Sequence, residues 1–296
     1  MTERDPTDKP AVTQDMIALF DDYTHLSLDR RKFMDNLAKM AGSMTAAVTV
    51  AGLMASNAQA QGLVPETDER LLIEDVTYPG ADGDMKGYLV TPKTSGPFGT
   101  VVVIHENRGL NAHIKDVARR VALEGFVALA PDFLSDQGGT PANEDDARAL
   151  FGTLTPADVT ADGVASMAYL KTLPSANGKV AAMGFCWGGG TVNALAVAAP
   201  DLAAGVAYYG AQPPAADVPK IKARLLLHYG GLDERVNAGI PAFETALKAA
   251  GTDYELFVYE GANHAFNNDT SSARYDKAAA DLAWSRTVAL FKETLA

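Results

Sequence analysis

Residues 179–190 read KVAAMGFCWGGG, a β-rich run that passes without a break into a cysteine and then into glycines. The first seven residues have the composition of a buried strand. Gly184 and Gly188 stand two positions on either side of Cys186, the Gly-x-nucleophile-x-Gly arrangement. A nucleophile on a sharp turn has a strained backbone, and side chains at those glycines would collide with the helix and the neighbouring strand. The stretch therefore predicts a strand, a tight turn at Cys186 and a helix from Gly188 to Ala199.

The turn places Cys186 at the N-terminus of the predicted helix, where the helix dipole and free N–H groups lower a thiol pKa and favour a developing oxyanion. Gly189 and Gly190 are expected to extend the clearance into the helix. Taken alone, the pentapeptide fits a buried, unreactive cysteine equally well. A catalytic interpretation therefore needs partners elsewhere in the chain.

Short β-rich runs alternate with longer helical patterns from Glu66 onward, which is typical of a mostly parallel central sheet with helices on both faces. Two antiparallel strands, 71–78 and 85–91, are expected to lead, and 100–105 reads as a central strand buried on both faces. With no repeat or linker, residues 66–296 are expected to form one α/β domain. Further strands are expected at 126–130, 204–209, 223–229 and 254–259, and further helices at 114–124, 143–151, 157–173, 241–250 and 273–295.

Two candidate partners follow later strands. Asp233 comes directly after the strand at 223–229, and His264 comes after the strand at 254–259. The order nucleophile, acid, histidine is the order of the α/β-hydrolase fold, which builds its active sites at the carboxyl edge of the sheet. Glu234 competes with Asp233, which is favoured because it comes first after the Gly-Gly-Leu turn. The sequence thus predicts a Cys186–His264–Asp233 triad.

The remaining histidines have other expected places. His25 belongs to the N-terminal segment, and His113 begins a helix. His228 lies inside an apolar strand, where packing explains it better than catalysis. His105 ends a strand but has no second ligand at metal spacing. None of the four is expected to be catalytic.

The loop after the central strand reads Ile104-His105-Glu106-Asn107-Arg108-Gly109-Leu110. A loop in this position supplies one oxyanion-hole N–H in α/β-hydrolases, and the residue after the nucleophile supplies the other. The backbone groups of Asn107 and Trp187 are therefore the candidates. Glu106 could hydrogen-bond the thiol, or it could be a solvated loop carboxylate.

Together these residues resemble the dienelactone hydrolase family (carboxymethylenebutenolidases) from about Leu71 to the C-terminus. The resemblance implies that Glu106 holds the resting cysteine and releases it when substrate binds, so that His264 can use the thiolate. Family members resemble one another in binding the substrate carboxylate with arginines, one of them four residues after the catalytic histidine. That position is Asn268 here, so a neutral ester or another lactone is as well supported as a dienelactone. Arg108 could contact an anion, although a surface role is favoured.

The expected function is hydrolysis of a small-molecule ester or lactone through an acyl-enzyme, with no metal or organic cofactor. A thiol-based redox enzyme and a non-catalytic binding module on a hydrolase scaffold are the alternatives. The net charge of −12 and the absence of a basic cluster argue against nucleic acid as a partner. The oligomeric state stays open, with a homodimer as one option.

Residues 1–60 carry the pattern of a twin-arginine export signal to the periplasm. Arg30-Arg31 precedes the weakly apolar stretch Met40–Ala55, and Ala58-Gln59-Ala60 ends it, with cleavage expected after Ala60. The stretch is shorter than the roughly 20 apolar residues of a stable membrane span. The alternative is a retained, cytoplasmic helical arm that packs on the domain or on a second subunit, because Met16, Ile17, Leu19 and Phe20 form an apolar helical stripe.

Overall fold

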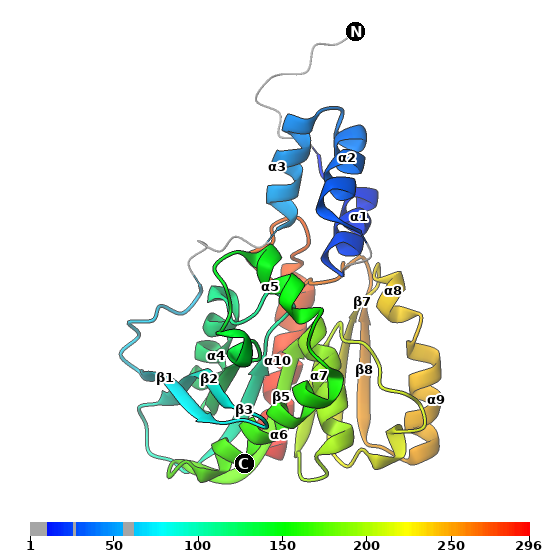
Figure 1. Ribbon diagram of the computed structural model, residues 1–296. Coiled ribbons are helices and arrows are strands. Elements are labelled where there is room, and N and C mark those ends of the chain that lie inside the picture. Colours follow the sequence, from blue (N-terminus) through cyan, green and yellow to red (C-terminus); the bar gives the residue numbers. More distant parts are fainter. Residues whose placement is uncertain (1–10, 26–27, 56–61) are drawn as a thin grey trace.

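The computed structural model describes residues 11–25, 28–55 and 62–296 (Figure 1). The described chain forms an eight-stranded sheet in the order β1-β2-β4-β3-β5-β6-β7-β8. β2 runs antiparallel to β1 and β4, and the other neighbours are parallel, so the predicted hairpin and mostly parallel sheet are confirmed. The strands are β1 (Leu71–Pro79), β2 (Asp84–Pro92), β3 (Phe98–Ile104), β4 (Val127–Asp132), β5 (Ala176–Phe185), β6 (Ala204–Tyr208), β7 (Arg224–Gly230) and β8 (Tyr254–Tyr259).

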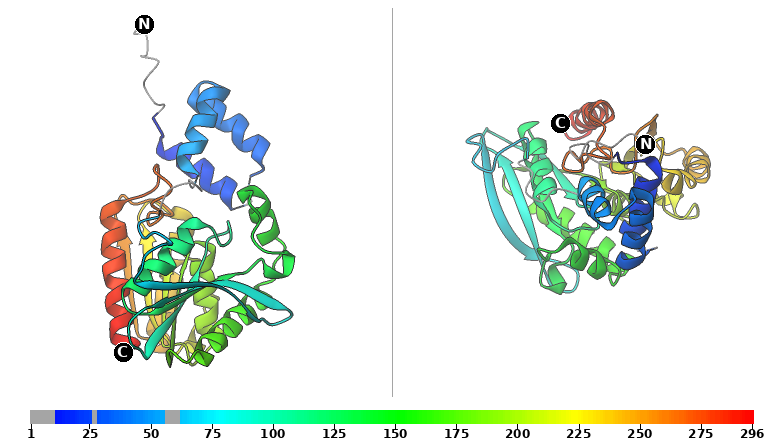
Figure 2. Two further views of the ribbon diagram at one scale, coloured as in Figure 1. Left: turned by 90° about the vertical axis from the view of Figure 1, so that its left-hand side faces the viewer. Right: turned by 90° about the horizontal axis from the view of Figure 1, so that it is seen from above.

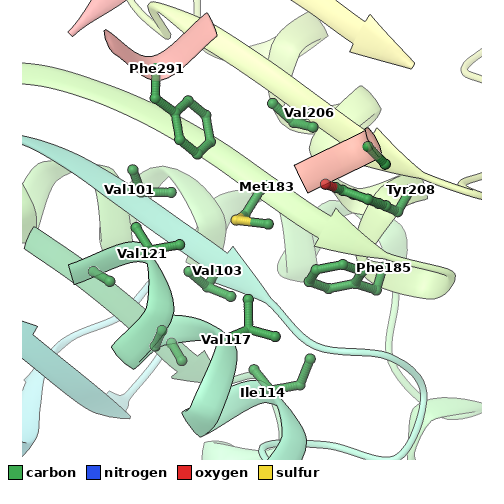
Figure 3. Close-up of a cluster of buried hydrophobic side chains, with 14 of the residues drawn as sticks. Val101, Val103, Ile114, Val117, Val121, Met183, Phe185, Val206, Tyr208 and Phe291 are labelled. Carbon is green, nitrogen blue, oxygen red and sulfur yellow. The ribbon is translucent and has the colours of Figure 1, made fainter. Parts of the chain in front are cut away.

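Helices cover both faces of the sheet because its central strands are apolar on both sides. On β3, Val101 and Val103 belong to a cluster with α4 and α10 (Figure 3). Val102 and Ile104 belong to a second cluster, with α6, α7 and α9. Each fully buried aliphatic side chain contributes about 1.5–3 kcal/mol to the free energy of folding, relative to the same side chain exposed to water. The helices are α4 (Ala112–Leu123), α5 (Glu144–Phe151), α6 (Pro156–Thr172), α7 (Trp187–Ala198), α8 (Glu234–Asn237), α9 (Ile240–Ala250) and α10 (Lys277–Thr294), with short 3-10 turns at Ser135–Gln137 and Val218–Lys220.

The closing helix starts later than the predicted Ala273. The side chain of Asp276 accepts a hydrogen bond from Ala279 N at 3.0 Å and caps α10, which begins at Lys277. Before it, Arg274 N donates to Ser271 O in a separate turn. Capping by an aspartate sets this boundary more firmly than the apolar periodicity that suggested the longer helix.

Three short helices precede the sheet: α1 (Gln14–Thr24), α2 (Arg30–Ala41) and α3 (Met44–Met54). We call them the cap, because they stand over the end of the sheet where the parallel strands finish (Figures 1 and 2). Side chains cap the start of each helix, and the apolar stripe predicted for α1 packs into a cluster separate from the domain core. The buried members are Met16, Ile17, Phe20, Tyr23, Phe33, Leu37, Ala47, Val50 and Met54.

The cap contacts the domain through hydrogen bonds at its base. Ser271 Oγ donates to Met54 O at 2.7 Å, Ala273 N donates to Leu53 O at 3.2 Å, and Gln14 Nε2 donates to Asn263 Oδ1 at 2.6 Å. These contacts are of the kind expected for a helical arm. The cleavage site expected after Ala60 lies outside the described residues, so export to the periplasm stays a prediction.

Among the described residues, no single helix is long and apolar enough to cross a bilayer. Helices α2 and α3 would reach that length and hydropathy only as a pair, and the chain bends by 109° between them.

Candidate active site

The turn between β5 and α7 holds Cys186 in a left-handed backbone conformation, with φ of 54°. A Cβ on Gly184 would lie 2.3 Å from Gly188 O, and one on Gly188 would lie 2.4 Å from His105 O. The collisions predicted for these two glycines are therefore confirmed, and Gly189 is equally confined, at 2.6 Å from Tyr208 O. The expectation for Gly190 is wrong, because a Cβ there would meet nothing closer than 3.5 Å.

The three residues of the predicted triad meet at the carboxyl edge of the sheet. His264, in the loop after β8, donates from Nδ1 to Asp233 Oδ2 at 2.5 Å. Asp233 caps α8, since its other oxygen accepts from Val236 N at 3.1 Å. The Nε2 atom of His264 has no hydrogen-bond partner among the described residues, and one ligand-type atom from each of His264 and Cys186 lies within 4.8 Å of the other. Glu234, the rejected alternative, is exposed on α8.

The site is almost closed to solvent, with exposed fractions of 9% for Cys186, 3% for His264 and 6% for Asp233. Burial would raise the pKa of the Cys186 thiol, but the charges of His264 and His25 lower it to about 6. Burial would likewise lower the pKa of His264, but Cys186 and Asp233 raise it to about 10. At a pH between these two pKa values, Cys186 and His264 form a thiolate–imidazolium pair, the ionisation state that a nucleophilic cysteine requires.

His25 is a fourth member of the site, and its sequence position in the N-terminal segment does not predict this. Its Nε2 lies 3.4 Å from Cys186 Sγ, and its ring stands at 85° to that of His264 with the centroids 5.0 Å apart. The Nδ1 of His25 lies 2.6 Å from Asp21 O, and Arg235 Nη2 donates to Nε2 at 2.9 Å. His25 reaches the sulfur because the cap places the end of α1 over the nucleophile.

Glu106 lies beside Cys186 in a cavity of ≈ 20 Å³ between the cap and the domain. Its hydrogen bonds run elsewhere: Oε2 accepts from Asn268 Nδ2 at 3.1 Å, and Oε1 accepts from Tyr209 Oη at 3.5 Å. The thiol contact predicted for Glu106 is therefore not among its hydrogen bonds here. Nor is Glu106 a solvated loop carboxylate, because it is only 7% exposed.

The two candidate oxyanion donors flank the nucleophile in the chain fold. Trp187 is the first residue of α7, a position whose N–H has no acceptor within its own helix. Asn107 follows β3, and its side-chain Nδ2 donates to Thr24 O of the cap at 2.7 Å. Their backbone roles stay predictions.

The surface role favoured for Arg108 is wrong. Arg108 is 8% exposed, and its Nη1 lies 3.5 Å from Asp145 Oδ1 and 3.7 Å from Glu144 Oε2, both on α5. Two further buried arginines contact the cap: Arg148 donates to Tyr23 O, and Arg274 lies 3.4 Å from Asp21 Oδ1. Acidic groups of α1 and α5 thus stabilise these arginines in buried positions.

The other three histidines have partners away from Cys186, and His228 is packed inside its strand as predicted. His228 is fully buried between Tyr259 Oη at 3.0 Å and Thr287 Oγ1 at 3.3 Å, and burial lowers its pKa to about 3. His105 stacks on Trp187. His113 pairs with Asp269 at 3.1 Å.

A groove of ≈ 1070 Å³ opens on the other side of the nucleophile, and Cys186 and His264 lie in its wall. Most of its lining is apolar, and a few charged groups, Arg148, Lys220, Asp217 and Arg235 among them, lie along it. Its apolar lining comes from the end of α5 and the residues after it, from α6, from α7 and from the loop after β6: Phe151, Leu154, Val159, Trp187, Ala194, Val197, Pro213 and Pro214. The arrangement places the Cys186 thiol in the wall of a mainly apolar groove, the kind of concave surface that binds small molecules.

The chain is similar to known proteins over most of its length. The model of the dienelactone hydrolase family matches residues 85–295, so α1–α3 lie outside the matched region. A protein of Synechocystis sp. named "putative carboxymethylenebutenolidase" is 34% identical over 238 residues, which make up 74% of this chain and 96% of that protein.

Solved structures show the same similarity. A crystal structure of a "putative dienelactone hydrolase" from Klebsiella pneumoniae has a TM-score of 0.70 and 29% identity, covering 75% of this chain and 99% of that one. A dienelactone hydrolase-like promiscuous phosphotriesterase from metagenomic libraries has a TM-score of 0.69 and 29% identity, covering 77% and 100%. The similarity to these two structures extends over almost all of their length.

Proposed function

The chain belongs to the dienelactone hydrolase family and is a hydrolase of ester or lactone bonds, and from this premise we propose that Cys186, His264 and Asp233 form its catalytic triad. The observation that carries the proposal is the 2.5 Å contact between His264 Nδ1 and Asp233 Oδ2, which leaves Nε2 of His264 without a partner among the described residues and near the thiol. A carboxylate on Nδ1 fixes the tautomer that such a base requires.

The reaction proceeds in two halves. Cys186 rests as a thiolate with its proton on His264 Nε2, and the thiolate attacks the substrate carbonyl carbon to give a tetrahedral oxyanion, which the N–H groups of Trp187 and Asn107 stabilise. The oxyanion collapses to a thioester, and the leaving alkoxide takes the proton from His264. Water then attacks the thioester while His264 accepts one of its protons, and the carboxylic acid leaves with the thiolate restored.

The substrate that fits this site is a neutral ester or lactone with a sizeable apolar group. The groove beside Cys186 is large enough for such a group and is lined mainly by apolar side chains. At the position where family members hold an arginine, Asn268 is fully buried and donates to Glu106. A substrate carboxylate would gain no cation there, so the site favours uncharged esters over a dienelactone.

Hydrolysis of p-nitrophenyl esters tests the proposal. We expect turnover by the wild type and a loss of at least two to three orders of magnitude in Cys186→Ala and His264→Ala, because the members of a triad act as a unit. Full turnover by Cys186→Ala would contradict the proposal. Peroxide consumption without ester turnover would instead favour a thiol-based redox enzyme.

A further inference from the structure

Three ligand-type side chains from distant parts of the chain surround one point. His25 ends α1, Cys186 begins the turn into α7, and His264 lies in the loop after β8. One ligand-type atom from each residue, a ring nitrogen or the sulfur, lies within 4.8 Å of the others. Two imidazoles and a thiolate form a donor set that zinc prefers.

The spacing matches a tetrahedral metal centre. Zinc–sulfur bonds of about 2.3 Å and zinc–nitrogen bonds of about 2.0–2.1 Å, at the tetrahedral angle, place sulfur and nitrogen about 3.5 Å apart. The observed distance between Cys186 Sγ and His25 Nε2 is 3.4 Å. That pair therefore needs almost no adjustment to share an ion.

Both imidazoles are also held in the orientation of metal ligands. A ligating histidine usually donates its second ring N–H to a carboxylate or a backbone carbonyl, which leaves the other nitrogen's lone pair for the metal. Here His264 Nδ1 is held by Asp233 Oδ2 at 2.5 Å, and His25 Nδ1 is held by Asp21 O at 2.6 Å. In each ring, Nε2 is the atom left to face the sulfur.

An unpartnered polar atom at the centre of the cluster points to a ligand. His264 is 3% exposed, yet its Nε2 has no hydrogen-bond partner among the described residues. A buried polar atom without a partner is costly, and coordination would remove that cost. At His25, Nε2 already accepts a hydrogen bond from the exposed Arg235 at 2.9 Å. The Arg235 guanidinium therefore occupies the lone pair of this nitrogen and must move away before a metal ion can bind.

We propose that His25, Cys186 and His264 form a binding site for a single zinc-class divalent ion, with a fourth position open toward the groove. On binding, the one proton that the Cys186–His264 ion pair holds on His264 Nε2 is released to solvent, and the Cys186 sulfur and that nitrogen both bond to the metal. The nucleophile and the base are then both occupied, so the ion acts as a reversible inhibitor and not as a cofactor. The cap supplies one of the ligands, which gives α1 a chemical role at the site.

Cobalt(II) titration of the reduced, chelator-treated full chain tests the site without any substrate. A thiolate bound to tetrahedral cobalt gives a sulfur-to-metal charge-transfer absorption and strong visible bands. We expect both to saturate at one ion per chain and to disappear when zinc is added. Because absorbance is the readout, the result does not depend on whether the chain hydrolyses a given ester.

Four variants make the assignment specific. Cys186→Ser should lose the charge-transfer band. His25→Ala and His25→Gln should bind at least about 10- to 100-fold more weakly, the loss typical of removing even an outer partner of a metal ligand. Arg235→Ala should bind as tightly as the wild type or more tightly, because it removes the competing cation. Circular dichroism and retained solubility establish that each variant is folded.

The proposal is overturned if the wild type shows no charge-transfer band. It is also overturned if both His25 variants bind cobalt with wild-type affinity, since the ion would then sit on Cys186 and His264 alone. Loss of binding in Arg235→Ala would likewise contradict it, because that guanidinium would then be supporting the site. A zinc inhibition constant for ester hydrolysis that rises in parallel with the cobalt dissociation constant across the variants links occupancy to the blocked nucleophile.

Discussion

The Nε2 atom of His25 lies 3.4 Å from the Sγ atom of Cys186, although 161 positions separate the two residues in the chain. The contact joins the cap to the nucleophile, and the two side chains belong to elements with separate apolar cores. An N-terminal segment that carries the pattern of an export signal thus also contributes a side chain to the active site. Its contribution can be measured on the thiol itself.

Removing His25 should raise the pKa of Cys186 above its value of about 6. The hydrogen bond with His25 is one of the causes that hold this pKa down, so His25→Ala moves it toward the ordinary thiol value of about 8.5. Iodoacetamide reacts with the thiolate, whose fraction grows as the pH rises through the pKa. The wild-type alkylation rate, measured with chelator present, should therefore reach half its plateau near pH 6, and that of the variant should do so at higher pH.

A control variant separates this effect from a general loosening of the cap. Lys39 is exposed on α2, so Lys39→Ala should leave the alkylation midpoint unchanged. An unshifted midpoint in His25→Ala would mean that His264 alone activates the thiol.

Asp233 has two roles that can be separated by substitution. One oxygen holds His264, and the other caps α8. Asparagine caps a helix as well as aspartate does, so Asp233→Asn should keep the stability of the wild type but lose about 10³- to 10⁴-fold in kcat through the wrong histidine tautomer. Asp233→Ala should lose the same activity and a further ~1 kcal/mol of unfolding free energy. Equal unfolding midpoints for the two variants in urea would contradict the capping role.

The glycines around the nucleophile differ in what they tolerate. A Cβ on Gly188 would lie 2.4 Å from a backbone oxygen that cannot move cheaply, so Gly188→Ala should destabilise the protein by about 1–3 kcal/mol or more. Gly190 is the matched control, since its Cβ would find ordinary contacts at 3.5 Å. Gly190→Ala should be neutral or stabilising by up to ~1 kcal/mol, as alanine favours a helix interior. Thermal unfolding distinguishes them, and a similar loss in both would refute the steric argument.

Much of the domain could be predicted because the patterns that specify its strands and helices lie within short stretches of the sequence. Strand and helix patterns alternate regularly, and parallel strands bring their carboxyl ends to one edge, so Cys186, Asp233 and His264 could be assigned to a common site. The sharp glycine-flanked turn could also be predicted, because the spacing of Gly184 and Gly188 around Cys186 is a local pattern in the sequence. The expectation for Gly190 is wrong because it rests only on the neighbouring glycines, whose steric confinement does not extend to this position.

His25 and Arg108 could not be predicted because their surroundings are set by tertiary contacts. The position of α1 over Cys186 depends on hydrogen bonds such as that from Asn107 Nδ2 to Thr24 O, and no local pattern records them. Arg108 stands in a polar loop that reads as surface, and it is buried only because the acidic start of α5 packs against it. The partners of Glu106 have the same origin.

The apolar groove should select among acyl or alcohol groups by size. Ala194 is half-buried on α7 and lines the groove, so Ala194→Phe fills part of the groove. For a p-nitrophenyl ester with a long acyl chain, kcat/KM should fall at least tenfold. A few methylene groups of the acyl chain can then no longer be buried in the groove, and each contributes ~0.8 kcal/mol when buried. The acetate ester should react nearly as fast as with the wild type. Equal losses for both esters would argue against the groove as the binding site.

Mass spectrometry of the acid-quenched reaction with a p-nitrophenyl ester tests the role of Cys186 most directly. Under conditions in which acylation outruns deacylation, the account predicts one added acyl group per chain, located on the peptide that contains Cys186, and no such group in Cys186→Ala. Continued turnover with the acyl group on another residue, or with Cys186 replaced, would contradict it.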